Sequence, residues 1–171
     1  YEISVRDWSS DVCSSDREVL EPAFVTSVAE VTGGPANLAR SSWDRSAYVE
    51  VEVPLGDASG SVHLEAAVTA SGPPVAAADG DVGHYGTCEV SLRRTFATGM
   101  VMQLYAPDRR SPFAPVQHLR AYLPNGRLYV VSSAGWSRAD DQGGVVRSGR
   151  SRLPLDSQQL ADLAARIAEL E

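Results

Sequence analysis

The sequence predicts an α+β fold: a meander-like antiparallel β-sheet of about six strands with a C-terminal amphipathic helix packed on it. Strict alternation of valines with polar residues over 48–53 predicts a half-buried strand. The pair Asn125–Gly126 between two apolar runs predicts a hairpin. Apolar residues at helical spacing over 160–170 predict the helix.

The first sixteen residues stand apart from the rest of the chain because of the order of their residues. Residues 7–16 are encoded, in order, by a DNA string common to short-read sequencing adapters, so residues 1–16 resemble translated adapter. The expected native part is one β-rich α+β domain over 17–171, truncated at its N-terminus. Cys13 then belongs to the foreign segment, and we expect Cys88 to be a buried thiol rather than its disulfide partner.

Composition limits the function classes. The formal net charge is −7, of which residues 1–16 contribute −3, so residues 17–171 carry −4. This mildly acidic balance argues against a general nucleic-acid binder. All 15 basic residues are arginine, a bias that GC-rich codons explain and that indicates a high-GC bacterium. No apolar run reaches the roughly 18 residues that a membrane helix needs. A signal peptide or membrane anchor is therefore expected only upstream of this segment.

The N-terminal elements are partly ambiguous. Over 17–46, Phe24, Val28 and Val31 have helical spacing with Pro22 in the first turn, but the valine and threonine content also allows a strand. Residues 48–53 and 62–69 then form strands around a loop at 56–60. Each strand has one apolar and one polar face, which predicts a sheet buried on a single side.

The middle of the chain alternates loops and strands. Residues 70–83 are expected to form an exposed loop, and 88–93 a strand with Cys88, Val90 and Leu92 facing inward. Residues 100–105 give a further strand. Residues 119–131 form the Asn-Gly hairpin, and 134–152 are a polar loop.

The C-terminal helix has a complete start signal. Asp156 and Gln159 make a capping box, and Leu155 precedes it as a staple onto Leu160. Asp162 and Arg166 are spaced as an i,i+4 ion pair. The apolar stripe that must be buried on the sheet consists of Leu160, Leu163, Ala164, Ile167 and Leu170.

Metal chemistry is not expected. Asp79, Asp81 and His84 suggest a calcium loop, but the Gly and Glu positions that such a loop needs are occupied by other residues. His84 and Cys88 suggest zinc, yet no short ligand pair of the Cys-x-x-Cys kind is present. The other two histidines, His63 and His118, are expected as exposed strand residues. We therefore assign no metal ligand and no cofactor.

Catalytic chemistry is not expected either. No Gly-x-Ser-x-Gly elbow, phosphate loop or dinucleotide fingerprint is present. His84 and Cys88 on one strand would lie about 13 Å apart, so no catalytic residue is assigned.

The pairs Arg93–Arg94 and Arg109–Arg110, near Tyr105 and Phe113, are expected at the solvated surface, with anion or partner binding as the alternative. Trp43 and Trp136 are expected at the core edge, although either could line a ligand pocket.

Residues 117–131 and 153–160 together resemble the ends of uncharacterised actinobacterial envelope or secreted proteins, which pair a Pro-Asp/Asn-Gly hairpin with a Pro-Leu-x-x-x-Gln-Leu helix. The resemblance implies an extracytoplasmic domain and no activity. The first functional hypothesis is a non-enzymatic domain that binds a protein partner or senses a signal at the envelope. The alternative is a carrier of a small apolar ligand or lipid between sheet and helix, and the third hypothesis is a hydrolase.

Overall fold

A seven-stranded antiparallel sheet forms the centre of the molecule, with strand order β1-β2-β3-β7-β6-β5-β4. The computed structural model describes residues 14–43, 47–69, 72–82, 90–109, 115–138, 146–147 and 152–170. The strands are β1 (Asn37–Ser42), β2 (Ala47–Leu55), β3 (Ala58–Val68), β4 (Val90–Thr95), β5 (Val101–Tyr105), β6 (Val116–Tyr122) and β7 (Arg127–Ala134). A separate short ladder pairs β8 (Ser137–Arg138) with β9 (Val146–Arg147).

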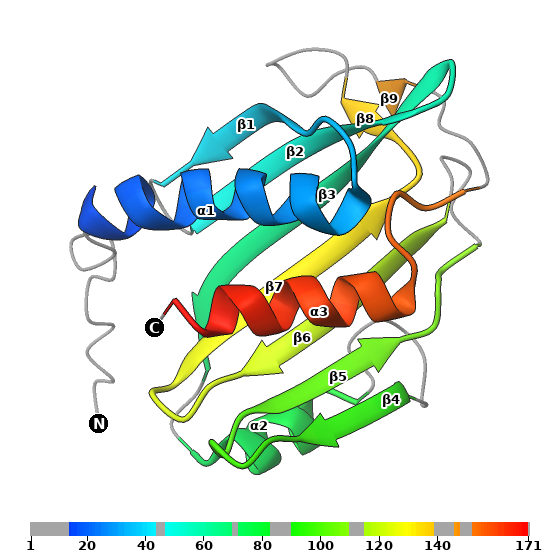
Figure 1. The fold of residues 1–171 in the computed structure, drawn as a ribbon. Helices are drawn as coiled ribbons and strands as arrows, with labels where there is room; N and C mark the ends of the chain where they lie inside the picture. Colours follow the sequence, from blue (N-terminus) through cyan, green and yellow to red (C-terminus); the bar gives the residue numbers. More distant parts are fainter. Residues whose placement is uncertain are drawn as a thin grey trace, which may run out of the picture.

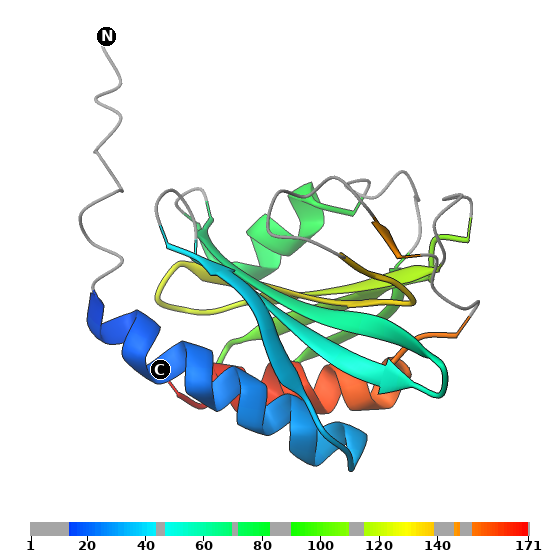
Figure 2. The same cartoon turned by 90° about the horizontal axis from the view of Figure 1, so that it is seen from above.

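Two long helices cover one face of this sheet. The helices α1 (Ser14–Thr32) and α3 (Ser157–Ala168) run side by side in opposite directions (Figure 1). The short helix α2 (Pro74–Gly80) lies on the opposite face (Figure 2). The predicted antiparallel sheet with a C-terminal helix is confirmed, although the sheet has seven strands rather than about six.

The core between the sheet and α1/α3 follows the predicted period-two burial. Val49, Val51 and Val53 are at most 5% exposed and face the helices. Helix α1 contributes Leu20, Phe24 and Val28 to the same core. Burying side chains of this size is the main stabilising contribution to such a fold, at roughly 1.5–3 kcal/mol each. From α3 the core takes Leu155 just before the helix, then Leu160, Leu163, Ala164 and Ile167.

The ambiguous stretch with Phe24, Val28 and Val31 is helical, and the strand after it was not predicted. Helix α1 ends at Thr32, and β1 follows after the turn at Gly33 and Gly34. Pro22 lies inside α1 and not in its first turn, because the helix begins at Ser14. Trp8 and Cys13, both in the segment that resembles translated adapter, lie outside the described residues.

The region 70–83 is not only a loop. It contains α2, which starts after Pro73 with Pro74 in its first turn and continues through three alanines. Proline is favoured at this position because a first-turn amide has no helical acceptor, and alanine has the highest helix propensity. Ala78 is fully buried against the sheet, so the helix is stabilised by packing that the local composition did not show.

Strand β4 is an edge strand, and this corrects the prediction for Leu92. Leu92 was expected to face inward, but it is 54% exposed. Alternation identifies which face a residue belongs to, but not whether that face is covered. A register shift between Val90 and Leu92 also interrupts the ladder with β5. Cys88 and His84 lie outside the described residues.

The predicted hairpin between β6 and β7 is confirmed, but its turn is longer than expected. The Gly126 amide donates to the Leu123 carbonyl over 3.0 Å, and the Leu123 amide donates to the Arg127 carbonyl over 2.9 Å. The loop is therefore Pro124-Asn125-Gly126 rather than Asn-Gly alone. Gly126 has φ of 84°, in the left-handed region where glycine is favoured.

Helix α3 begins as predicted. The Asp156 side chain accepts from the backbone amides of Gln158 and Gln159, and the Gln159 side chain closes the capping box. The expected Asp162–Arg166 pair is replaced, because Arg166 forms an ion pair with Glu30 on α1. Leu170, expected in the buried stripe, lies beyond the end of the helix and is 44% exposed.

The outer face of the sheet was expected to be solvent-exposed, and this is wrong for much of its area. Glu50 is 1% exposed, Gln103 is 0% exposed and Arg120 is 7% exposed. Helix α2 covers the β5–β6 part of this face and β8 lies near β3, so the polar side chains there are buried by long-range packing. Because an unpaired buried polar group is costly, their partners matter: Gln103 donates to the Ala78 carbonyl, Arg120 pairs with Asp81, and Glu50 accepts from the Tyr48 hydroxyl.

Candidate functional site

The outer face of β2 and β3 holds a cluster of Glu50, Ser61 and His63. The two strands place Glu50 directly opposite His63. The Ser61 Oγ lies 2.7 Å from His63 Nε2, and Glu50 Oε1 lies 3.8 Å from the same nitrogen. Tyr48 and Trp136 contact the imidazole edge to face, at centroid distances of 5.8 and 5.7 Å. Sequence reasoning treated His63 as an exposed strand residue, and this was wrong because its imidazole is largely enclosed.

This cluster does not have the geometry of a nucleophilic triad. The Ser61 hydroxyl donates its one proton to the Trp136 carbonyl. In the contact with His63, the Ser61 oxygen must therefore accept a hydrogen bond from Nε2–H. A general base would instead have to accept the hydroxyl proton, with the carboxylate on the other ring nitrogen. Ser61 is also 0% exposed, which leaves no approach for a substrate. The cluster orders the outer face rather than activating a nucleophile.

The second imidazole of the outer face is partnered in a similar way. His118 Nδ1 lies 2.8 Å from Ser132 Oγ. Ser132 is on β7, opposite His63 of β3 on one side and opposite His118 of β6 on the other. His118 is half-buried rather than exposed as expected. Among the residues that the structure describes, no three His, Cys, Asp or Glu side chains come together as a possible metal site.

The carboxylates of the suggested calcium loop are used to attach α2. Asp81 pairs with Arg120, and its Oδ2 also accepts from the Tyr122 hydroxyl over 2.8 Å. Asp79 pairs with Arg93 of β4. Both carboxylates are thus neutralised by arginines, which opposes the arrangement of free oxygens that calcium requires.

The hydroxyl of Tyr122 is held where α2 is attached to the sheet. Burial raises the pKa of Tyr122 well above its ordinary value of about 10, and the hydrogen bond to Asp81 raises it further. The neutral phenol is therefore the form that the folded protein holds. Its proton is fixed in the α2 attachment and is not available for transfer near neutral pH.

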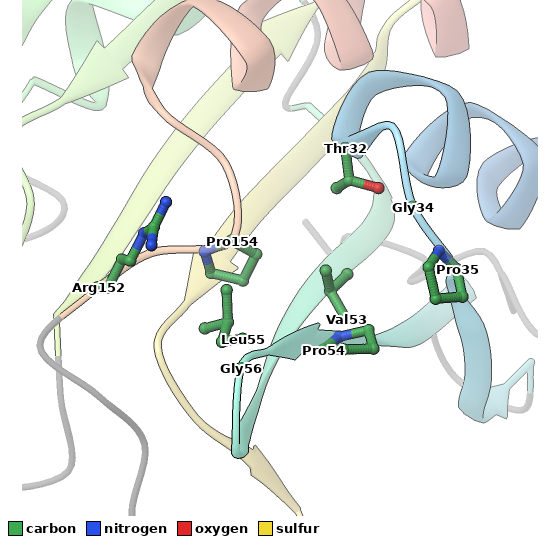
Figure 3. Close-up of a pocket in the computed structure, with 9 residues that line it drawn as sticks. All are labelled: Thr32, Gly34, Pro35, Val53, Pro54, Leu55, Gly56, Arg152 and Pro154. Atoms are coloured by element: carbon green, nitrogen blue, oxygen red, sulfur yellow. The ribbon is translucent and has the colours of Figure 1, made fainter.

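One end of the molecule carries an open pocket with a volume of ≈420 Å³ (Figure 3). It lies between the end of α1, the β2–β3 hairpin and the segment that leads into α3. Thr32 and Arg152 are the polar side chains in it, and Figure 3 shows both beside the prolines. The full lining is Thr32, Gly34, Pro35, Val53, Pro54, Leu55, Gly56, Arg152 and Pro154.

The wall of this pocket depends on Gly60. A Cβ on Gly60 would lie 2.6 Å from Pro154 Cγ and 2.8 Å from the Ala134 carbonyl oxygen. Only glycine therefore lets the segment before α3 pass so close to β3. A neighbouring pocket of ≈460 Å³ shares Arg152 and Pro154 and adds Arg109 at its rim. Arg110 and Phe113 lie outside the described residues.

A third site, the α3–β4 groove, lies on the helix-covered face at the β4 edge. Its floor consists of Met102, Leu104 and Leu119, and its β4 wall of Leu92, Arg94 and Phe96. The α3 wall consists of Gln158, Ala161, Asp162 and Ala165. The groove encloses only ≈100 Å³, so it is a shallow surface feature rather than a cavity for a lipid.

The arginine and tryptophan predictions have mixed outcomes. Arg94 is exposed as expected and lies over the Phe96 ring, 4.7 Å from its centroid, whereas Arg93 is paired with Asp79. Trp43 is half-buried and packs against the main core, consistent with a core-edge position. Trp136 packs on His63 and does not line any of the three pockets described above.

Sequence reasoning did not identify the groove or the end pocket, because each joins segments far apart in the chain. The exposed hydrophobic residue of an edge strand would have been the usable signal for the groove. No helix among the described residues is long and apolar enough to cross a membrane. In comparisons with protein-family models, curated proteins and solved structures, nothing matches this chain.

Proposed function

We propose that this chain is a non-enzymatic domain that binds a protein partner on the extracytoplasmic side of a bacterial envelope. The observation that carries the proposal is the α3–β4 groove, where Leu92 is 54% exposed above an apolar floor. A single exposed apolar residue is common on soluble domains, whereas a contiguous apolar surface marks an interaction site, and Leu92 is continuous with Phe96 and the groove floor.

The groove fits a protein better than a lipid. Its volume of ≈100 Å³ corresponds to only a few water molecules at about 30 Å³ each. Between the sheet and the two helices, large buried side chains of the described residues pack against one another. A hydrolase gains no support from Ser61 and His63, because the hydroxyl proton is committed to a backbone carbonyl.

Site-specific photo-cross-linking in the native host tests the proposal. A photoreactive residue at position 92 should give a discrete protein adduct, whereas the same residue at Val68, which is 42% exposed at the end of β3, should not. Adducts at both positions, or at neither, would contradict a partner site at the groove. Labelling of Leu92→Cys by a membrane-impermeant maleimide in intact cells tests the extracytoplasmic location, with the unsubstituted protein as control.

A second candidate function is the binding of a small ligand at the end pocket. Its volume of ≈420 Å³ falls within the range of small-molecule sites, and Arg152 supplies one cation at the rim. Native mass spectrometry of protein purified from the host would reveal a copurifying ligand. The bound mass should disappear in Thr32→Trp, which fills the pocket from the end of α1, and its persistence there would place the ligand elsewhere.

A further inference from the structure

We infer that the partner in the α3–β4 groove is a second copy of this chain, docked about a two-fold axis so that Arg94 of each copy meets Asp162 of the other. The inference rests on the proposed function, because it names the occupant of the same surface. Four features carry it: opposite charges on the two walls, the lack of an ion pair between them, the apolar residues that line the groove around them and the edge position of β4.

The two walls carry one charge each, of opposite sign. Arg94 projects from β4, and Asp162 from α3, and both line the groove. A two-fold axis through the groove exchanges the walls, so each arginine is brought to the aspartate of the other copy. A surface with this arrangement is complementary to itself, which is what an isologous dimer requires.

Neither charge is neutralised by an ion pair within the described part of the chain. Arg94 lies over the Phe96 ring, and Asp162 accepts a hydrogen bond of 2.7 Å from Gln158 Nε2. By contrast, Arg166 on the same helix is paired with Glu30, and Arg93 on the same strand with Asp79. The residues that flank the groove thus have partners within the chain, whereas the groove charges do not pair with each other.

Apart from Gln158, the other residues that line the groove are apolar, and those beside Arg94 on its wall are partly exposed. Leu92 is 54% exposed, and Phe96 is half-buried beside it. The facing side of α3 offers Ala161 and Ala165, small residues one turn apart that allow close approach of a second surface. Docking two such surfaces would bury both leucines next to the charge pairs, so that apolar contact and ion pairing would act together in one interface.

The sheet layout explains why this surface is uncovered. Helix α1 contacts β1 and β2, and α3 contacts β5, β6 and β7. Strand β4 is the last strand of the sheet, and the groove beside it is lined from β5, β6 and α3. The helix layer therefore stops one strand short of the edge, as Figure 1 shows for α3 and β4.

Analytical ultracentrifugation of the purified chain tests the inference. The unsubstituted protein should sediment as a monomer–dimer equilibrium. Arg94→Glu places two like-charged pairs across the axis, and so does Asp162→Arg, so each should weaken the dimer association constant at least roughly tenfold. Mixing the two variants should restore the dimer, because the introduced glutamate of one chain then meets the introduced arginine of the other. The second contact of this heterodimer joins the unchanged Asp162 of the first chain to the unchanged Arg94 of the second.

Matched controls separate this result from general effects of charge or hydrophobicity. Arg166→Glu makes the same charge change on α3 outside the groove, and Val68→Asp makes a change comparable to Leu92→Asp at a similarly exposed site. Both controls should dimerise like the parent chain, whereas Leu92→Asp should not. Far-ultraviolet circular dichroism should be the same for all variants, since the substituted positions are exposed.

Two outcomes would overturn the inference. A parent chain that remains monomeric at all accessible concentrations excludes the dimer. A dimer that persists in both single variants excludes the groove as its interface. Failure here is distinguishable from failure of the proposed function. A monomeric chain that still gives a cross-link at position 92 to a protein of different mass retains a partner site, but its occupant is not a second copy.

Discussion

The two faces of the sheet are covered in different ways. On one face, α1 and α3 bury a continuous apolar core, and the sequence pattern of this face is regular. On the other face, α2 is attached largely by polar groups: Asp81 with Arg120 and Tyr122, and the Ala78 carbonyl with the Gln103 amide at 2.7 Å. Apolar burial tolerates approximate geometry, whereas a buried polar network is favourable only when every member is satisfied.

This difference predicts that the two faces respond differently to substitution. Loss of a core side chain should cost its transfer free energy plus the free energy of a cavity. Loss of one member of the polar network should leave its partner buried without compensation. The following substitutions test the contrast, in order of decreasing expected effect.

Leu163→Ala should have the largest effect. Leu163 is fully buried in the core formed by the sheet, α1 and α3. Truncation of a buried leucine typically lowers the free energy of unfolding by 2–5 kcal/mol, and we expect about 3 kcal/mol here. Urea denaturation measures the change, and the exposed Leu170→Ala at the end of the same segment is the control with little effect. Equal losses for the two variants would show that α3 does not seal the core.

Arg120→Met should have the next largest effect. It retains the aliphatic stem but removes the guanidinium that pairs with Asp81. Breaking a fully buried pair costs 3–5 kcal/mol, but the Asp81 side chain is 31% exposed and water can solvate it, so we expect about 2 kcal/mol. The double variant Asp81→Asn/Arg120→Met should recover part of this loss in urea denaturation. A double variant less stable than Arg120→Met would indicate that the charge of Asp81 has another partner.

The contrast between the faces also explains what the sequence could predict. Alternation is a local property, and it correctly placed Val49 and Val51 on the buried side. The capping box of Asp156 and Gln159 is contained within four residues, and it was also correct. Elements stabilised by neighbours close in the chain were therefore accessible from the sequence.

Features that depend on distant segments were not accessible. The burial of Glu50 and Arg120 requires outer-face cover from α2 and the β8 region, which local polarity cannot reveal. The exposure of Leu92 depends on the position of β4 at the end of the sheet order. The end pocket joins residues 32–35, 53–56 and 152–154, and only the folded chain brings them together. The same holds for both walls of the α3–β4 groove.

Asp156→Ala tests the locally encoded start of α3. The Asp156 carboxylate accepts from the amides of Gln158 and Gln159, each over 2.9 Å. Loss of an N-cap side chain usually costs about 1 kcal/mol, and we expect a loss of that size in thermal or urea denaturation. Asp156→Ser, which retains a capping oxygen, should recover most of it. A Ser variant no more stable than the Ala variant would indicate that the negative charge, rather than the hydrogen bond, stabilises the helix.

Tyr122→Phe should have the smallest effect at neutral pH but the most specific dependence on pH. The lost hydrogen bond to Asp81 should cost less than about 1 kcal/mol, because Arg120 still neutralises the carboxylate.

In the folded protein the pKa of Tyr122 is raised above its ordinary value of about 10, so the folded state retains this proton after the unfolded state has lost it. The stability that the neutral phenol contributes is therefore complete below pH 10 and declines as pH rises above it, by up to about 1.4 kcal/mol per pH unit. Urea denaturation from pH 8 to pH 11 should show the advantage of the parent chain over Tyr122→Phe shrinking above pH 10. Parallel curves would mean that the phenol ionises as readily in the folded chain as in the unfolded one, and that α2 does not shield it.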